Sequence, residues 1–213
     1  EVYAVKIFYL HLGNDTSSAS YYADELGAAI MLNSDSKQWR RNYDLAHELF
    51  HLVTWKVRNP DADASSLELE EKFADFFASN LLIPEQALHS AVVSVMSSDN
   101  KITYDDLDKI ARQFNVSLDA LCWRLCYVYK IPSEGIKDII DRAKTNSNLP
   151  IRESEKPQTF PPRYIALAVN ALKHGKISSK QFANYLDISI SEAYSYNIQE
   201  DFDGILQIKT DPL

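Results

Sequence analysis

Residues 40–55 read RRNYDLAHELFHLVTW. The apolar residues recur at helical spacing, which predicts a helix over about residues 36–57 that ends before Asn59 and Pro60. On such a helix His47 and His51 lie one turn apart on the same face. The opposite face is expected to be buried by Leu45, Leu49, Leu52 and Val53.

The five residues HELFH form an H-E-x-x-H pattern within this predicted helix. In that pattern the two histidines, here His47 and His51, supply two nitrogen ligands to one zinc ion. The glutamate between them, Glu48, is placed to act as general base on a water molecule. A single histidine in a helix is usually a packing or surface residue, but this pair on one helical face predicts a metal site.

A third ligand is required, because catalytic zinc sites usually have three protein ligands and one open position. No histidine follows at the spacing H-E-x-x-H-x-x-G-x-x-H, because Val57 stands at the position of the third histidine. A second predicted helix, from about residue 66 to 82, offers carboxylates that could complete the site. Its acidic candidates are Glu68, Glu70, Glu71 and Asp75.

Glu71 is the preferred third ligand, with Asp75 accepting the second ring N–H of a ligating histidine. These two carboxylates are four residues apart and share a face flanked by Ala74 and Ala78, small enough for close helix packing. Glu68 and Glu70 are expected to be solvated near the helix N-terminus, where negative charge is favourable. The other flanks are expected to be core, through Phe73, Phe76, Phe77 and Leu81.

The remaining patterns predict an α+β fold that is mostly helical. Residues 2–10, 21–26 and 28–33 read as short strands, with a polar loop over 13–20. Helix starts are expected in a capping-box form at Ser65 to Glu68 and at Thr103, Ser117 and Ser133. The domain division expected is a main domain at 1–145, a linker or surface strap at 146–162, and a small helical extension at 163–213.

Composition places the chain among ordinary soluble proteins. It has 213 residues, a formal net charge of −8 and no run of eighteen apolar residues, so no membrane segment is expected. The acidic balance disfavours non-specific nucleic-acid binding and is compatible with a basic protein partner. Cys122 and Cys126 read as reduced core thiols, which favours a cytoplasmic location. The chain begins with Glu1 rather than methionine, as expected of a fragment or processed product.

The two predicted site helices resemble those of the ImmA/IrrE metallopeptidases. The similarity is strong over residues 1–130 and looser to about 200. Two residues differ from the family's usual pattern: Phe50 stands where glycine is usual, which is expected to narrow or reshape the cleft, and Asp75 stands where asparagine is common. The matching positions are Arg41, Leu45, Ala46, His47, Glu48, Leu49 and His51, then Glu71, Ala74, Asp75, Phe77, Ala78, Leu81, Leu82 and Pro84.

The resemblance implies a gluzincin-like peptidase that holds one Zn²⁺ ion. It carries over His47, His51 and Glu71 as ligands and Glu48 as catalytic base. It also implies a protein substrate, a helix-turn-helix repressor or an antitoxin, whose cleavage regulates gene expression. The alternative is a non-catalytic, metal-containing regulatory or protein-binding module. Tyr43, His89 and Arg41 stay open as donors to the oxyanion.

The C-terminal residues 178–196 have the pattern of a helix-turn-helix. A DNA-reading version would carry arginine or lysine on its second helix. This one offers Ser191, Glu192, Tyr194 and Asn197 there. Direct DNA binding by the chain is therefore not expected, and a small packing or protein-recognition role is favoured. The pattern does not determine the oligomeric state.

Overall fold

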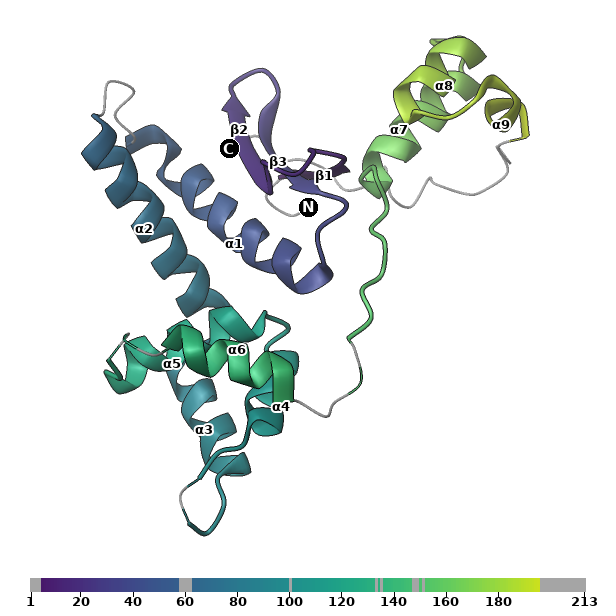
Figure 1. Cartoon of the computed structure of the whole chain (residues 1–213). Coiled ribbons are helices and arrows are strands. Elements are labelled where there is room, and N and C mark those ends of the chain that lie inside the picture. The colour runs from purple at the N-terminus through teal and green to yellow at the C-terminus, as the bar shows by residue number, and fades with distance from the viewer. Residues whose placement is uncertain are drawn as a thin grey trace.

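The computed structural model describes residues 5–57, 63–99, 101–132, 134, 136–146, 150 and 152–195. Helices dominate these residues and one small sheet lies among them, which confirms the predicted α+β fold (Figure 1). The strands are β1 (Lys6–Leu10), β2 (Ser18–Ala23) and β3 (Gly27–Asn33). The helices are α1 (Gln38–Thr54), α2 (Ala64–Leu82), α3 (Glu85–Val95), α4 (Tyr104–Gln113), α5 (Leu118–Tyr129), α6 (Ile136–Asn146), α7 (Pro162–Lys173), α8 (Ser179–Leu186) and α9 (Ile190–Ser195).

The sheet has the order β1-β3-β2, with β1 parallel and β2 antiparallel to β3. The turn between β2 and β3 ends at Gly27, whose φ of +70° suits glycine. β2 begins at Ser18, inside the segment predicted as a polar loop, so that loop was predicted too long. Serine is tolerated there because β2 is an edge strand, and its residues line a polar cleft.

Helix α1 lies between α2 on one side and strands β2 and β3 on the other (Figure 1). Ala74 and Ala78 of α2 are fully buried, as predicted for a closely packed helix face. The prediction for α1 itself was partly wrong, because Val53 is 64% exposed. The buried residues of α1 are mostly polar, since the helix face that carries the histidines is the enclosed one: they are Arg41, Asp44, Ala46, Glu48 and His51.

The helix starts follow the predicted caps, with one correction. Helix α2 is capped by Asp63, whose side chain accepts a hydrogen bond from the backbone N–H of Ser66, and not by the predicted box at Ser65. The capping box of Thr103 at α4 and the cap of Ser117 at α5 are both confirmed. Ser133 lies outside the described residues.

Helices α3 to α6 form a second part of the core below α1 (Figure 1). Ile83, Leu88, Ile110 and Leu121 are almost fully buried in it. Cys122 and Cys126 are buried on α5 and are not joined in a disulfide, as predicted for core thiols.

An extended strap over residues 152–160 leads from these helices to the far edge of the sheet (Figure 1). The guanidinium of Arg152 lies 4.4 Å from the ring centre of Trp39, and the backbone N–H of Tyr9 donates to the carbonyl of Thr159 at 3.0 Å. Beyond the strap, α7, α8 and α9 pack around the buried ring of Phe182. The helix-turn-helix pattern is thus formed by α8 and α9. The boundary at residue 163 stays a prediction, and residues 196–213 lie outside the described residues.

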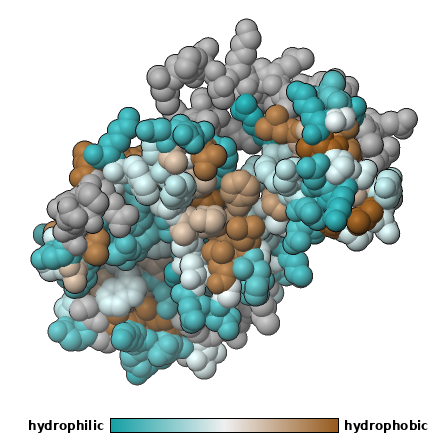
Figure 2. Space-filling view, turned by 90° about the horizontal axis from the view of Figure 1, so that it is seen from above, coloured by the Kyte–Doolittle hydropathy of each residue, from teal (hydrophilic) through white to brown (hydrophobic). Residues whose placement is uncertain are grey.

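Seen from above the view of Figure 1, hydrophilic side chains cover much of the surface, and hydrophobic ones gather in separate patches (Figure 2). Among the described residues no helix combines the length and apolar character needed to cross a bilayer.

Candidate metal centre

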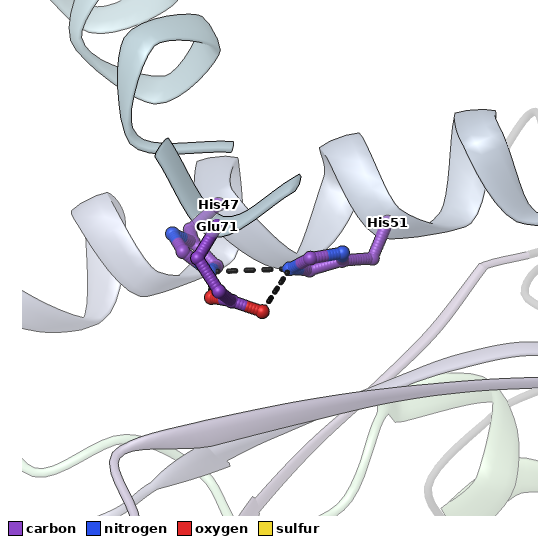
Figure 3. A group of neighbouring side chains, drawn as sticks. All are labelled: His47, His51 and Glu71. Carbon is purple, nitrogen blue, oxygen red and sulfur yellow. Dashed lines mark hydrogen bonds and ion pairs between the residues drawn. The ribbon is translucent and has the colours of Figure 1, made fainter. Parts of the chain in front are cut away.

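Three donor groups from α1 and α2 converge on one point. The Nε2 atoms of His47 and His51 lie 3.2 Å apart, because one helical turn separates the two rings. The carboxylate of Glu71 completes the triangle, with one oxygen 3.0 Å from His47 Nε2 and the other 3.5 Å from His51 Nε2 (Figure 3). The chosen ligand atoms all lie within 4.8 Å of one another.

These separations fit a tetrahedral metal ion. Ligand atoms bound about 2.0–2.1 Å from such an ion lie about 3.3–3.4 Å from one another. The three observed contacts, at 3.0, 3.2 and 3.5 Å, are close to that value. Two imidazoles and one carboxylate are also a donor set that zinc accepts in catalytic sites. His47, His51 and Glu71 therefore form a group that could hold one metal ion.

Each histidine is oriented by a second carboxylate of α2. His47 Nδ1 lies 3.0 Å from Asp75 Oδ1, and His51 Nδ1 lies 3.0 Å from Glu70 Oε1. When each Nδ1 donates its proton to a carboxylate, each Nε2 keeps its lone pair for the metal. The prediction that Glu70 is solvated was wrong, because α2 turns this side chain toward His51. Glu68 is exposed, as predicted, and its carboxylate pairs with the ammonium group of Lys72.

The carboxylates create a negative environment around the rings. The hydrogen bond to Asp75 raises the pKa of His47, the charges of Asp75, Glu71 and Glu48 add to this, and partial burial acts against it. The same hydrogen bond from His47 lowers the pKa of Asp75. An arrangement that favours a protonated imidazole by charge also favours a bound cation at the same point.

Glu48 lies on the same cleft wall as the donor group. Its side chain is 7% exposed, and Oε1 accepts a hydrogen bond from Ser18 Oγ of strand β2 at 2.8 Å. An open cleft of about 1000 Å³ is lined by Glu48, His47, His51, Glu71 and Asp75 together. The structure thus brings every site residue predicted from the sequence into one cavity. Their roles as ligands and base stay predictions.

The three candidate oxyanion donors occupy different places. Tyr43 lines the cleft, and its hydroxyl lies 3.2 Å from the carbonyl oxygen of Asp75. Burial, followed by the charge of Asp75, raises the pKa of Tyr43, so this hydroxyl keeps its proton at neutral pH. Arg41 instead bonds the carbonyl of Glu155 in the strap, and His89 contacts Tyr129. Tyr43 is therefore the one of these three that lines the cleft.

Phe50 stands outside the cleft lining. Its ring lies 5.8 Å from the ring of His51 and 5.8 Å from the ring of Phe77. Phe50 was expected to narrow or reshape the cleft, but its ring instead packs against His51 and Phe77.

Glu70→Ala should weaken zinc binding by about 10–100-fold, the range typical for loss of an outer partner of a ligating histidine. His51 would then lose the acceptor that holds its Nδ1 proton. A competition titration with a chromophoric chelator measures the affinity. The control is Glu68→Ala on the same helix, which should bind zinc like the parent; equal affinity for Glu70→Ala and the control would reject the role of Glu70.

Comparison with known proteins identifies one family. Residues 1–126 match the model of a peptidase family described as the IrrE N-terminal-like domain. A search of curated proteins found no match. Among solved structures, a Mycobacterium tuberculosis transcriptional regulator aligns with a TM-score of 0.41 at 18% identity, over 56% of this chain and 36% of the regulator. The aligned part is thus little more than a third of that regulator.

Proposed function

Because the chain belongs to the IrrE N-terminal-like peptidase family, we propose that it is a zinc-dependent endopeptidase acting on a specific regulatory protein. The observation that carries this proposal is the convergence of His47, His51 and Glu71 within 4.8 Å, beside the buried Glu48. His47, His51 and Glu71 are the proposed ligands, and Asp75 and Glu70 hold the two rings in place.

Each residue has a separate part in the proposed hydrolysis. A zinc ion, if held by His47, His51 and Glu71, would supply a Lewis acid at this point of the cleft. Glu48 accepts the proton of the attacking water and delivers it to the leaving amine. The protonated hydroxyl of Tyr43 is the proposed donor to the developing oxyanion. Ser18 holds the Glu48 carboxylate through its 2.8 Å hydrogen bond before substrate arrives.

Strand β2 offers a place for the substrate backbone. In the part of the chain that the structure describes it is an edge strand, since it pairs with β3 on one side, and Ser18 and Ser20 line the cleft. An extended peptide that adds to such an edge gains main-chain hydrogen bonds without regard to its sequence. We place the scissile segment along β2, with its carbonyl facing the metal centre.

The proposed substrate is a helix-turn-helix repressor or an antitoxin. The test uses the zinc-loaded chain and a candidate helix-turn-helix repressor or antitoxin from the same organism, and mass spectrometry identifies the products. Cleavage at one bond, abolished by a chelator and restored by zinc, supports the proposal. A repressor that stays intact with the zinc-loaded chain, while binding it, favours the non-catalytic alternative instead.

The open cleft argues against that alternative. A structural zinc site usually closes all four positions with cysteine or histidine. Here the donor group faces a cavity of about 1000 Å³, and neither cysteine lines it. A buried glutamate beside the donors also has a direct use in hydrolysis and none in a closed structural site.

The C-terminal unit α7–α9 should show no sequence-specific DNA binding. Helix α9, the second helix of the helix-turn-helix, has the sequence ISEAYS and carries no basic side chain to reach phosphates or bases. Footprinting at physiological salt, with promoter DNA controlled by the candidate repressor, is the measurement. A protected site with this chain alone would assign DNA recognition to the unit.

A further inference from the structure

Three aromatic side chains face the cleft, and one of them, Phe76, was predicted as core. Phe76 of α2 is 45% exposed, and Trp123 and Tyr127 of α5 are 46% and 62% exposed. All three line the cleft that also contains His47 and Glu71. We call them the aromatic wall. Large apolar groups gathered in water beside polar residues are typical of a binding site.

The aromatic wall is built on two helices that are tied together. Arg124 is buried on α5, its Nε donates to the carbonyl of Ile83, and its Nη2 donates to Asn80 Oδ1 at 2.8 Å. The ring of Tyr127 lies over the Arg124 guanidinium and meets Phe76 edge-on at 5.2 Å between ring centres. Phe76 and Tyr127 are therefore held in place before any ligand binds, which lowers the ordering cost of binding.

The charges of the cleft select for a basic partner. Six carboxylates and two guanidiniums line the cleft, which gives a formal excess of four negative charges. One bound divalent cation would offset two of these four charges. Both guanidiniums are engaged, Arg40 with Asp44 at 2.9 Å and Arg124 as described. The remaining negative potential attracts positively charged segments and repels acidic ones. The carboxylates are those of Asp15, Asp44, Glu48, Glu71, Asp75 and Asp119.

We propose that the aromatic wall is the subsite that receives a large apolar side chain from a basic peptide segment bound in this cleft. The inference rests on the proposed function and names the class of substrate for the same site. Strand β2 and helix α5 lie on opposite sides of α1 (Figure 1). One cleft joins Ser18 and Ser20 of β2, the donor group and the aromatic wall, so a peptide segment that passes the metal centre can place one of its side chains against the wall.

The test measures binding without turnover, using the zinc-loaded full chain with Glu48→Gln. Fluorescent peptides with a lysine-rich background carry either one central phenylalanine or one central alanine, and a third places phenylalanine in a glutamate-rich background. Fluorescence anisotropy gives each Kd. The lysine-rich phenylalanine peptide should bind about tenfold more tightly than its alanine counterpart, equivalent to about 1.4 kcal/mol. The glutamate-rich peptide should bind more weakly by at least a similar factor.

A matched pair of variants locates the subsite. Phe76→Ala should remove most of the preference for the phenylalanine peptide. Trp123→Ala removes a second ring of the aromatic wall and should have the same effect. Phe73→Ala is the control, because Phe73 lies on the same helix, is 53% exposed and does not line the cleft. Melting temperatures of all variants should stay near that of the parent, since each changed side chain is about half exposed.

The outcomes separate this inference from the proposed function. Equal affinity for the phenylalanine and alanine peptides, equal effects of Phe76→Ala and Phe73→Ala, tight binding of the glutamate-rich peptide, or no binding at millimolar peptide would each overturn it. If the parent chain cleaved both lysine-rich peptides equally well, the result would support the proposed peptidase activity and reject the aromatic subsite. Selective binding of the lysine-rich phenylalanine peptide, without cleavage of any peptide or repressor, would support the aromatic subsite and reject the proposed peptidase activity.

Discussion

His47→Ala and Glu71→Ala should each yield a protein with little bound zinc. Either change removes one of three donors whose atoms lie within 4.8 Å of one another. Loss of a direct ligand should exceed the roughly 10–100-fold weakening expected for loss of an outer partner. Elemental analysis after dialysis against a weak chelator gives the occupancy, and the parent should retain close to one zinc ion.

The control for this experiment is Glu68→Ala. Glu68 lies one turn before Glu71 on α2, is exposed, and pairs with Lys72 rather than with a histidine. Its removal changes the net charge by the same amount as Glu71→Ala and should leave zinc in place. Full occupancy in Glu71→Ala would show that the third ligand was assigned to the wrong residue, with Glu70 or Asp75 as the replacement.

The local geometry of the site was accessible from the sequence because it depends on helical spacing. His47 and His51 are four residues apart, and so are Glu71 and Asp75, so each pair shares a face once its helix forms. Ala74 and Ala78, which flank the face of Glu71 and Asp75, indicated where α2 approaches another helix, and both are fully buried.

The role of Glu70 was missed because it depends on how α2 is rotated against α1. Glu70 and Glu71 are neighbours in sequence, and on a helix they point in directions about 100° apart. Both still reach the histidines, Glu70 at His51 and Glu71 at both rings, because α1 presents the two rings one turn apart. Negative charge near a helix N-terminus is equally favourable for a solvated glutamate, so it gave no reason to predict the contact between Glu70 and His51.

Exposure on α2 was misjudged for a related reason. Phe73, Phe76 and Leu81 were predicted as core because of their residue types, yet each is about half exposed. Helix α2 packs on α1 through its small residues, so its large apolar ones are left on other faces. An apolar residue at the surface is unremarkable singly, but Phe76 stands with two further aromatic rings at the cleft.

Glu48→Gln should lower the rate of repressor cleavage by about 10²–10⁴, the usual contribution of a general base. Glutamine has nearly the same shape as glutamate and can still accept the hydrogen bond from Ser18 through its amide oxygen. It cannot take a proton from the attacking water. The helix, the donor group and zinc content should therefore be preserved while turnover is lost.

Three measurements on the same preparation separate loss of chemistry from loss of structure: the single-turnover cleavage rate, the zinc content and the melting temperature. Ser18→Ala is the informative companion, because it removes the partner that holds the Glu48 carboxylate and leaves the base itself intact. It should reduce the rate less than Glu48→Gln does. A Glu48→Gln protein that cleaves the repressor as fast as the parent would show that another group takes the proton, since no carboxylate would remain at that position of the cleft to accept it.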